Sequence, residues 1–409
     1  MKIILLCSIF PPEPYVAAQT AFSMAKRFSA IGHQVTVVTS FPNHPGGKFY
    51  PGYKNKLISN EKSQFCFEIV RCLTAISSKS TFLSRFIENI VFGISAAAYL
   101  LYIPRPDIIH SDTWPVFATG LMSIVARLRK IPYIVRVVDL YPESIVSQNR
   151  IGQPHWMIKM MRCMDQWIAH GAFHVVVLTK SFSEVYQKDR KIPTEKITVI
   201  PDWVDGDLEC VNIDEVEEIR QQFNIADDDF LVAYGGNIGI AAGVDKLINA
   251  CSLIEEVRVL IAGGGSELQA CRELANRIAP DRIFFYYPWP KEKTMALHQA
   301  ADVLLLPTQG MQTIASIPSK IIRYMLSARP IIAAGLPETE LSNLIEESGC
   351  GWLIPPDDPE ALAQAILESK GVGKNERDLR GQAGREYALE HLTAEINLPK
   401  VIKIIERPT

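Results

Sequence analysis

Residues 316–330, SIPSKIIRYMLSARP, combine hydroxyl side chains, a proline and cations in a pattern that suits anion binding. The residues concerned are Ser316, Ile317, Pro318, Ser319, Lys320 and Arg323. The segment is expected to form a helix with Pro318 at its first position, because a proline has no N–H group to leave unpaired there, and with one of the two preceding residues as N-cap. A lysine in the first turn opposes the helix dipole, so a bound phosphate or diphosphate would compensate it. The alternative is a surface helix with two unrelated cations.

Two glycine-rich segments in the second half of the chain suit close contact between a ligand and the backbone. The first, GGNIGIAAGVDKLI, contains Gly235, Gly236, Asn237 and Ile238 before an expected helix with Lys246, and the second, GGGSEL, contains Gly265. Ligands bind beyond the carboxyl ends of parallel strands, where helix N-termini attract anions. We therefore expect a ligand at both segments. The segment PPEPYVAAQT after the first apolar run lacks G-x-G-x-x-G, which argues against a dinucleotide-dependent dehydrogenase.

The candidate binding segments can meet only if the strands before them end beside one another in a sheet. The sequence suits this arrangement, because short apolar runs alternate with amphipathic segments through most of the chain. The expected strands are residues 3–9, 35–39, 108–110, 134–138, 175–178 and 197–200, then 230–234, 258–262, 283–286, 303–306, 331–333 and 352–354. This alternation predicts an α/β protein with two parallel sheets, each covered by helices on both faces. A break near IPDWVDGDLEC predicts a first domain at residues 1–203 and a second at residues 204–392.

Composition limits the classes of partner and cofactor. A chain of 409 residues exceeds what one hydrophobic core usually serves, and 48% apolar with 21% charged residues is typical of a globular protein. The net charge of −3 argues against nucleic acid as a partner. Eight scattered cysteines without a C-x-x-C pair indicate reduced thiols in the cytoplasm and no zinc site. The acidic triplet at residues 227–229 is interpreted as a solvated loop. Residues 205–207, DGD, have the spacing of a metal–diphosphate clamp but do not follow an apolar strand, so no metal is expected.

The first third of the chain is basic and contains one long uncharged segment. Residues 1–130 hold 14 Lys/Arg and 6 Asp/Glu, a net charge of +8, which leaves −11 for the remainder. Residues 90–103, IVFGISAAAYLLYI, are too short to span a bilayer, which takes about 20 residues. They are expected to form a buried helix. The alternative is a helix on an anionic membrane surface, supported by Lys79, Arg85 and the lysines at positions 48, 54, 56 and 62.

In their order and spacing, these segments resemble the retaining glycosyltransferases of family 4. That family has the GT-B fold, two Rossmann-like domains facing across a deep cleft. The matching segments are FPPEP, PDIIH, LRKIPYIVRVVDLYPES, VIPDWVD, YGGNIGIAAGVDKLINA, VLIAGGG, ADVLLLPT, IPSKIIRYMLSARPII and GCGWLIPPDDPEALAQAI. Within the family, the chain looks most like the bacterial enzymes of O-antigen, capsule and exopolysaccharide synthesis.

The chain departs from the family pattern on the donor side. Two family glutamates, eight residues apart, correspond to Ala315 and Arg323, and the second of them normally holds the donor ribose. The family's basic pair beside the diphosphate corresponds to Asn237 and Ala242. The cations that would replace the missing positive charge are Lys246, Lys320 and Arg323.

The resemblance implies a metal-independent enzyme that transfers a hexose or N-acetylhexosamine with retention, from UDP-glucose or UDP-N-acetylglucosamine by preference. No cofactor is expected besides this nucleotide-sugar substrate. The departing nucleoside diphosphate gains negative charge as the glycosidic bond breaks, and preorganised donors and cations must stabilise it. The expected donor contacts are the glycine segments, residues 316–320 and Arg323. The uracil base is expected near Tyr287, Pro288 and Trp289.

The resemblance also implies that the first domain binds a lipid-linked or saccharide acceptor. The expected acceptor residues are Glu13, Tyr15, Ala17, Ala18, Gln19 and Thr20, and the candidate catalytic residues are His110, Asp112, Asp139 and Glu143. Asp139 and Glu143 would orient the acceptor hydroxyl or the transferred sugar, although in the family's proposed mechanism the donor phosphate itself takes the proton. His110 fits a structural role equally well. The family's glycine pair is replaced by Ala17 and Ala18, its histidine two residues after His110 by Asp112, and residues 393–409 are expected to cross back to the first domain.

Two other functions remain open at this point. One is a catalytically silent paralogue that binds a nucleotide sugar, suggested by Ala315 and Arg323; the other is an epimerase of the same fold, which would convert the donor without an acceptor. The expected location is the cytoplasm, with peripheral attachment to the inner face of the plasma membrane as an alternative.

Overall fold

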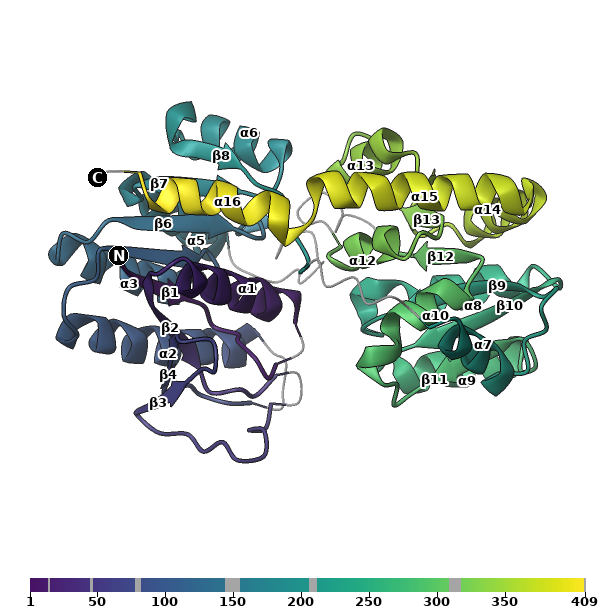
Figure 1. The fold of residues 1–409 in the computed structure, drawn as a ribbon, viewed down its shortest axis with the longest axis horizontal. Coiled ribbons are helices and arrows are strands. Elements are labelled where there is room, and N and C mark those ends of the chain that lie inside the picture. Colours follow the sequence, from purple (N-terminus) through teal and green to yellow (C-terminus); the bar gives the residue numbers. More distant parts are fainter. Residues whose placement is uncertain are drawn as a thin grey trace. The chain divides into compact units, whose positions relative to one another are not determined.

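The chain forms two compact units. The computed structural model describes residues 1–13, 15–44, 47–77, 82–143, 155–205, 212–308 and 318–407. The first unit comprises Met1–Asp205 and Ala394–Thr409, and the second comprises Gly206–Thr393. The boundaries expected from the sequence, after residues 203 and 392, lie two residues and one residue earlier. Figure 1 shows that each unit has its own sheet with helices around it.

The first unit is built on an eight-stranded sheet with the order β3-β4-β2-β1-β5-β6-β7-β8. Its strands are β1 (Lys2–Leu6), β2 (Gln34–Ser40), β3 (Ile58–Lys62), β4 (Glu68–Cys72), β5 (Ile108–Asp112), β6 (Tyr133–Val137), β7 (His174–Val177) and β8 (Ile197–Val199). Its helices are α1 (Val16–Ala30), α2 (Phe82–Tyr102), α3 (Val116–Leu128), α5 (His155–Gly171), α6 (Lys180–Lys188) and α16 (Ala394–Ile405). The strands are short and rich in β-branched residues, as expected for parallel strands buried on both faces.

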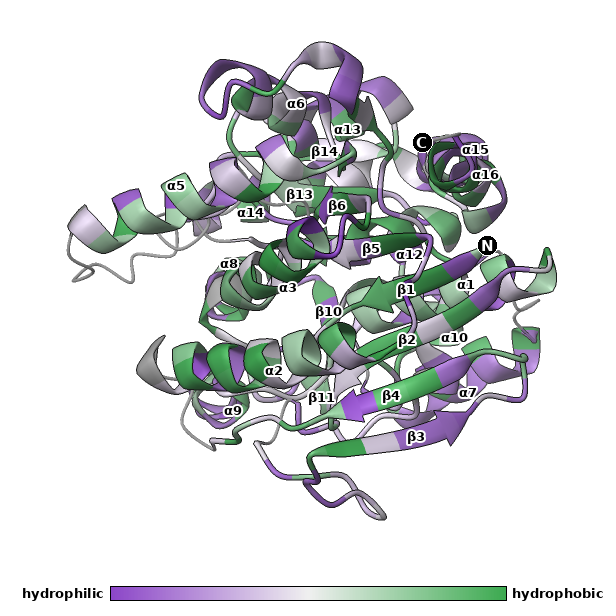
Figure 2. Cartoon of the chain, turned by 90° about the vertical axis from the view of Figure 1, so that its left-hand side faces the viewer, coloured by the Kyte–Doolittle hydropathy of each residue, from purple (hydrophilic) through white to green (hydrophobic). Residues whose placement is uncertain are grey.

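Helices cover both faces of this sheet. Alternate side chains of a strand point to opposite faces, and in β1 Ile3 and Leu5 pack with α1 and α16, whereas Ile4 and Leu6 pack with α2, α3 and α5. Figure 2 shows the same division, with α2, α3 and α5 on one side of the strands and α1 with α16 on the other. The C-terminal helix α16 therefore completes the core of the first unit, where the sequence places it.

The edge of this sheet differs from the prediction. The twelve expected strands are present, but β3 and β4 were not expected, and β3 runs antiparallel to β4. β3 reads ISNEK and alternates between exposed and half-buried positions. A short edge strand with charged side chains has little hydrophobic pattern, and such charges discourage pairing with other chains. The expectation of purely parallel sheets is therefore wrong for this hairpin.

The second unit is built on a six-stranded parallel sheet with the order β11-β10-β9-β12-β13-β14. Its strands are β9 (Phe230–Gly235), β10 (Val257–Ala262), β11 (Ile283–Tyr286), β12 (Val303–Leu306), β13 (Ile331–Ala334) and β14 (Gly351–Ile354). Its helices are α7 (Ile213–Gln222), α8 (Val244–Ser252), α9 (Leu268–Ile278), α10 (Thr294–Ala300), α12 (Lys320–Leu326), α13 (Glu340–Ser348), α14 (Pro359–Gly371) and α15 (Gly373–His391). If these strands are renumbered 1 to 6 along the chain, starting at β9, their order in the sheet is 3-2-1-4-5-6, which is that of the Rossmann fold.

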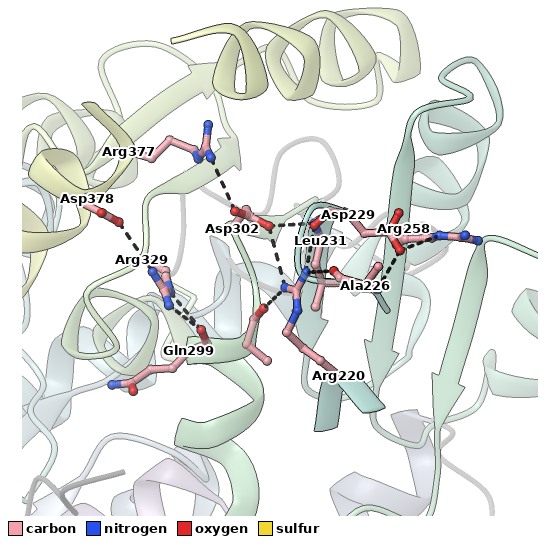
Figure 3. Close-up of polar contacts among 11 residues, drawn as sticks. Arg220, Ala226, Asp229, Leu231, Arg258, Gln299, Asp302, Arg329, Arg377 and Asp378 are labelled. Carbon is pink, nitrogen blue, oxygen red and sulfur yellow. Dashed lines mark hydrogen bonds and ion pairs between the residues drawn. The ribbon is translucent and has the colours of Figure 1, made fainter. Parts of the chain in front are cut away.

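Paired charges hold the amino ends of these strands together (Figure 3). The carboxylate of Asp302, just before β12, accepts a hydrogen bond from Leu231 N and lies 3.5 Å from Nη2 of Arg377 and 3.9 Å from Nη1 of Arg220. The pair Arg258–Asp229 has a separation of 3.3 Å, and the pair Arg329–Asp378 one of 3.7 Å. Each of these four arginines thus has a carboxylate nearby.

The uncharged segment at residues 90–103 lies in α2. Phe92, Ala96 and Leu100 are buried in the core, whereas Ile94 and Leu101 on the same helix are exposed. Among the residues that the structure describes, no helix has the length and hydrophobicity needed to cross a bilayer. The helix is therefore buried along one side only.

Candidate functional site

Both sheets have a point where the chain reverses the direction in which strands are added. In the second unit, the chain passes from β9 to β10 and β11 on one side and then to β12 on the other side of β9. In the first unit, the same reversal lies between β1 and β5. Ligands of open parallel sheets bind beyond the carboxyl ends of the strands at such points. Each unit therefore has one candidate site, and the two are described separately.

Two glycine loops interlock at the carboxyl ends of β9 and β10. Gly236 and Gly263 have φ values of 151° and 146°, in the left-handed range that favours glycine. A Cβ atom at Gly263 would lie 1.8 Å from the carbonyl oxygen of Gly236, and one at Gly265 would lie 2.2 Å from that of Ile238. Ile238 N in turn donates a hydrogen bond of 2.9 Å to Gly264 O. Glycines are required here because the two backbones touch.

The segment after β11 reaches the same loops. A Cβ atom at Gly264 would lie 2.5 Å from Cε2 of Tyr287, so the tyrosine ring lies directly against this glycine. Tyr287 and Pro288 are exposed, and Trp289 is half-buried. An exposed aromatic ring beside a glycine loop offers a flat apolar surface on which a planar base can stack. The structure thus brings the expected base-binding residues to the glycine loops.

Lys320 is the cation at these loops. Its Nζ lies 2.8 Å from the position of a Cβ atom on Gly236, donates a hydrogen bond of 2.5 Å to Tyr234 Oη, and is 4.3 Å from the centroid of the Tyr234 ring. Burial lowers the pKa of Lys320 to about 8, because the charged amine is removed from water. No described carboxylate forms an ion pair with it, in contrast to the arginines at the amino ends of the same sheet.

Aromatic residues below the loops hold the lysine and the backbone in place. Tyr234 Oη donates to Asn237 O at 2.7 Å, and Tyr324 Oη accepts a hydrogen bond of 2.9 Å from Gly235 N. His298 lies under Gly235 with its ring 4.8 Å from that of Tyr324. Burial, with the charges of Arg323 and Lys320, lowers the pKa of His298 to about 3, so this imidazole is neutral.

These three aromatic residues were not predicted from the sequence. Tyr234 directly precedes the glycine pair, and Tyr324 lies four residues after Lys320, one turn along the same helix. These positions could have identified the two tyrosines from the sequence. Tyr324 shares a helix face with Lys320, because residues i and i+4 lie on the same side of a helix. His298 has no comparable signal, since it comes from α10 and reaches the loops only through the fold.

The expected start of the helix with Lys320 is wrong by two residues. α12 begins at Lys320, with Ser319 as an N-cap whose side chain makes no capping bond, and Pro318 precedes it. Ile321 N donates to Pro318 O at 3.0 Å, a tight turn of the kind common at helix ends. Ser316 and Ile317 lie outside the described residues, as does Ala315. Arg323 is half-buried on α12, close enough to His298 to affect its pKa.

Lys246 is placed differently from Lys320. It lies near the start of α8, with its Nζ 3.2 Å from Oδ2 of Asp245, and both side chains are partly exposed. A surface pair of this kind already has a counterion. Lys320, in contrast, lies against the glycine loops, and no carboxylate in the described part of the chain forms an ion pair with it.

A cavity of about 250 Å³ lies at the reversal point of the first unit. Its lining residues are Ser8, Ile9, Tyr15, Ser40, His44, Thr74, Arg85, Glu88, Asn89, Phe92 and Trp114. Ser8 and Ile9 follow β1, Ser40 ends β2 and Trp114 follows β5, so the cavity is at the carboxyl ends of the strands. Hydroxyl, amide and aromatic groups together are the usual lining of a site for a small polar ligand.

The charged groups of this cavity are paired with one another. Buried Glu88 lies 2.9 Å from His44 Nε2 and 2.7 Å from Arg85 Nη1, and Arg85 also contacts His44 Nδ1 at 3.0 Å. Burial alone would raise the pKa of Glu88, but the hydrogen bonds and charges of His44 and Arg85 hold it below the ordinary value. The carboxylate therefore stays ionised and orients both neighbours.

Glu13 holds in place the loop that carries His44, one of the residues that line this cavity. Its buried carboxylate accepts hydrogen bonds from Phe10 N at 3.3 Å, Asn43 N at 3.1 Å and His44 N at 2.9 Å. Burial raises the pKa of Glu13, although these N–H groups oppose the shift. We therefore correct the prediction that Glu13 contacts an acceptor. Its two oxygens instead accept the hydrogen bonds that hold the loop carrying His44. Tyr15, whose ring lies edge-on to His44 at 6.4 Å, is exposed and lines the cavity.

The other expected acceptor residues lie in α1 with different exposures. Ala17 is half-buried and Gln19 is exposed. Ala18 is fully buried, so its methyl group belongs to the core and leaves no surface for an acceptor. The buried Thr20 hydroxyl donates to Val16 O at 3.1 Å and to Asp202 Oδ1 at 3.2 Å. Ala18 and Thr20 thus hold the structure, and Ala17 and Gln19 remain predictions.

A buried cluster of charges includes two of the candidate catalytic residues. Arg136 lies 3.4 Å from Asp112 Oδ1 and 2.7 Å from Asp202 Oδ1. Burial raises the pKa of Asp112 although Arg136 opposes this. Burial, followed by the charge of Asp202, raises the pKa of Asp139 to about 6. A carboxyl group that titrates near neutral pH is suited to proton transfer. The expected role of Asp139, to orient the acceptor hydroxyl or the transferred sugar, remains a prediction.

His110 is buried, and two arginines hold Glu143. Burial, followed by the charge of Arg136, lowers the pKa of His110 to about 3, and its Nε2 has no hydrogen-bond partner among the described residues. The choice between a structural and a functional His110 therefore stays open. Glu143 accepts a hydrogen bond of 2.7 Å from buried Arg190 and lies 3.4 Å from Arg162. Its role toward an acceptor remains a prediction. Arg136, Asp202 and Arg190 were not predicted, because their partners lie far away in the sequence.

No group of three or more His, Cys, Asp or Glu side chains that could hold a metal ion occurs within the described part of the chain.

Family comparisons match each unit separately. Residues 17–208 match the family described as Glycosyltransferase Family 4, and residues 229–369 match the family described as Glycosyl transferases group 1. The first match lies almost entirely in the first unit, and the second lies within the second unit.

Two curated relatives cover most of the chain. The probable glycosyltransferase WbjE of Pseudomonas aeruginosa is 24% identical over 83% of this chain and 85% of its own length. The putative colanic acid biosynthesis glycosyl transferase WcaI of Escherichia coli K12 is 21% identical over 99% of this chain and 100% of its own length.

Solved structures show the same fold. Sucrose-phosphate synthase from Thermosynechococcus elongatus superposes with a TM-score of 0.77 and 19% identity, covering 98% of both chains. HepE of Anabaena in complex with UDP superposes with a TM-score of 0.72 and 15% identity, covering 98% of this chain and 99% of that one. The two Rossmann-like units are therefore those of the GT-B fold.

Proposed function

Because the chain belongs to the glycosyltransferases, with a Family 4 domain followed by a group 1 domain, we propose that it transfers a hexose or N-acetylhexosamine from a UDP-sugar, with retention, to a lipid-linked or saccharide acceptor. UDP as the nucleotide is supported by HepE, whose structures contain UDP and UDP-glucose. A role in cell-surface polysaccharide synthesis is supported by the name of WcaI.

The observation that carries this proposal is Lys320. It is half-buried against the interlocked glycine loops and no described carboxylate forms an ion pair with it, although removing a charge from water without a counterion is costly. The donor diphosphate supplies the missing negative charge. Backbone around Gly236 and Asn237, with Arg323 on the same helix as Lys320, completes its surroundings, and Tyr287 stacks on the uracil. No metal is required for this arrangement.

The proposed chemistry gives each unit its own part. The bond between the anomeric carbon and the phosphate oxygen breaks, and the electron pair goes to the departing UDP, which Lys320 stabilises. The acceptor oxygen forms the new bond to the anomeric carbon and loses its proton. In this proposal the proton passes to Asp139, whose pKa of about 6 suits acceptance near neutral pH, or to the departing phosphate. The acceptor sugar occupies the cavity lined by Tyr15, His44 and Trp114.

Calorimetric titration with UDP tests the donor site. Lys320→Ala is expected to weaken UDP binding by about 10- to 100-fold, since a hydrogen bond to a charged group contributes about 1.5–3 kcal/mol. Lys320→Arg keeps the charge and is expected to retain most of the affinity. Uridine, which has no phosphate, should bind both variants as it binds the wild type. Unchanged UDP affinity of Lys320→Ala would refute this donor site.

A catalytically silent nucleotide-sugar-binding protein is the second candidate, favoured by Arg323 at the position of a family glutamate on α12. Incubation of UDP-glucose and UDP-N-acetylglucosamine with membranes separates the two. Acceptor-dependent release of UDP supports the transferase, whereas binding without release supports the silent protein. Conversion of the donor sugar without membranes would identify an epimerase instead.

A further inference from the structure

The outward side of helices α2, α3 and α5 exposes large apolar side chains. These three helices lie side by side over one face of the first unit's sheet (Figure 2). Their exposed apolar residues include Ile87, Ile94 and Leu101 on α2, Leu128 on α3, and Trp156 and Trp167 on α5. Leu128 is 73% exposed, Trp156 66% and Ile94 57%. We call this surface the α2–α3–α5 face.

The spacing of these residues makes the face continuous along each helix. Ile87, Ile94 and Leu101 are seven residues apart, which places them in one row on α2. Trp156 and Trp167 on α5 are eleven residues apart, three helical turns, and therefore share one side of that helix. Isolated exposed apolar residues are common, but rows of them on α2 and α5, with Leu128 on the helix between, mark an interaction surface.

The charged groups of the α2–α3–α5 face are cations. The three helices contain two acidic residues, Glu88 and Asp165, and both are buried. Arg127, Lys159 and Arg162 are exposed on the same helices. The guanidinium of Arg127 stacks on Trp167 at 3.8 Å, and Arg162 reaches Glu143 at 3.4 Å. Helices with apolar rows, tryptophans and cations, and with no exposed acid among their described residues, complement an anionic bilayer, in which tryptophans prefer the interface.

We propose that the α2–α3–α5 face binds the surface of an anionic lipid bilayer, with the tryptophans and leucines in the headgroup region and the cations against lipid phosphates. Long basic side chains suit this position, because they bury their stems and keep the charge at the headgroups. If the proposed transfer to a lipid-linked acceptor is correct, α2 connects the two sites, since Arg85, Glu88 and Asn89 of this helix line the acceptor cavity while Ile87 and Ile94 are exposed.

Flotation of the full chain with vesicles tests the proposal. The protein is expected to float with vesicles of phosphatidylcholine and phosphatidylglycerol, and much less with phosphatidylcholine alone. The double variant Lys159→Gln/Arg162→Gln should lower the partition coefficient about 25-fold, since each cation near an anionic surface contributes about fivefold. The double variant Leu128→Ser/Trp156→Ser should lower it at least tenfold, because each large apolar side chain gains from leaving water.

Matched variants in the second unit serve as controls. Leu379→Ser on α15, where the side chain is 67% exposed, and Lys374→Gln/Arg277→Gln, which removes two exposed cations, should leave flotation unchanged. Calorimetric UDP binding by every variant shows that the fold and the donor site are intact, so a failure of this proposal is distinguishable from a failure of the proposed function. No flotation of the wild type, equal flotation with neutral vesicles, or equal losses in the control variants would overturn the proposal. So would a dimer in analytical ultracentrifugation that Leu128→Ser/Trp156→Ser converts to a monomer.

Discussion

The reversal points of the two sheets have the same topology, but they differ in whether their cations are paired with carboxylates. In the first unit, Arg136 pairs with Asp112 and Asp202, and Arg85 pairs with Glu88. In the second unit, the glycine loops hold Lys320, with no carboxylate among the described residues to pair with it. A paired buried charge holds the fold in place, whereas a cation without a carboxylate can bind an anionic ligand. This difference supports the proposal that the second unit binds the diphosphate.

The same contrast between paired and unpaired cations occurs within the single sheet of the second unit. At the amino ends of its strands, Arg220, Arg258 and Arg377 each have a carboxylate within 3.9 Å (Figure 3). At the carboxyl ends, Lys320 has a tyrosine hydroxyl and a ring face. One sheet therefore separates cations that hold structure from a cation available to a ligand.

The largest effect is expected from breaking the charge cluster of the first unit. Arg136→Ala leaves Asp112 and Asp202 buried near each other without a cation, which should lower the free energy of unfolding by about 3–5 kcal/mol. Urea denaturation followed by tryptophan fluorescence measures this. Arg258→Ala, which breaks a partly exposed pair, should cost no more than about 1 kcal/mol. Similar losses of unfolding free energy in both variants would contradict the distinction between a buried charge cluster and a partly exposed ion pair.

Next in size is the effect of Asp139 on turnover. Asp139→Asn is expected to lower the rate of sugar transfer about 100-fold if the carboxylate accepts the proton, with UDP affinity unchanged. Asp139 is ionised above its pKa of about 6, so the wild-type rate should rise from pH 5 to 7 and then level off. The variant should lose this rise. Wild-type turnover in Asp139→Asn would show that the departing phosphate takes the proton instead.

The pH dependence of UDP affinity should reveal the unpaired lysine. Free Lys320 loses its proton above a pKa of about 8, and a bound diphosphate raises that pKa. The affinity should therefore be constant from pH 7 to 7.5 and fall toward tenfold per pH unit above pH 8. Lys320→Arg should show no such fall, because a guanidinium stays charged. Calorimetry across this range would reject the role of Lys320 if the two proteins behaved alike.

The smallest expected effect is a gain in stability. Lys320→Met removes a half-buried cation and should raise the free energy of unfolding by about 1 kcal/mol at pH 7. The pKa of Lys320 is lower in the folded than in the unfolded protein, so the unfolded protein binds more protons between about pH 8 and 10.5 and wild-type stability rises there. The advantage of the variant should shrink accordingly over this range. A loss of stability at pH 7 would instead show that Lys320 supports the fold.

Much of the fold could be predicted because its signals are local. The apolar runs at β6 and β7 and the glycines after β9 are visible in short windows of sequence. The edge strand β3 could not be predicted, because charged and polar residues on a half-exposed strand leave no strong pattern. In the site, the glycine loops and Lys320 were predicted from composition and spacing, whereas Ala18, an expected acceptor contact, is part of the core.

By itself, the sequence determined two Rossmann-like units, the segments at their reversal points and Lys320 as a candidate cation for the proposed donor site, because hydrophobic period, glycine content and helix spacing are properties of neighbouring residues. Only the tertiary structure decided which charges are paired. Arg136 meets Asp202 across 66 positions of sequence, and Lys320 meets Tyr234 across 86. The fold also decided that the acids of α2 and α5 are buried, while the lysine, the arginine and the tryptophans of α5 are exposed. Burial and pairing depend on contacts between distant segments, which no short window of sequence contains.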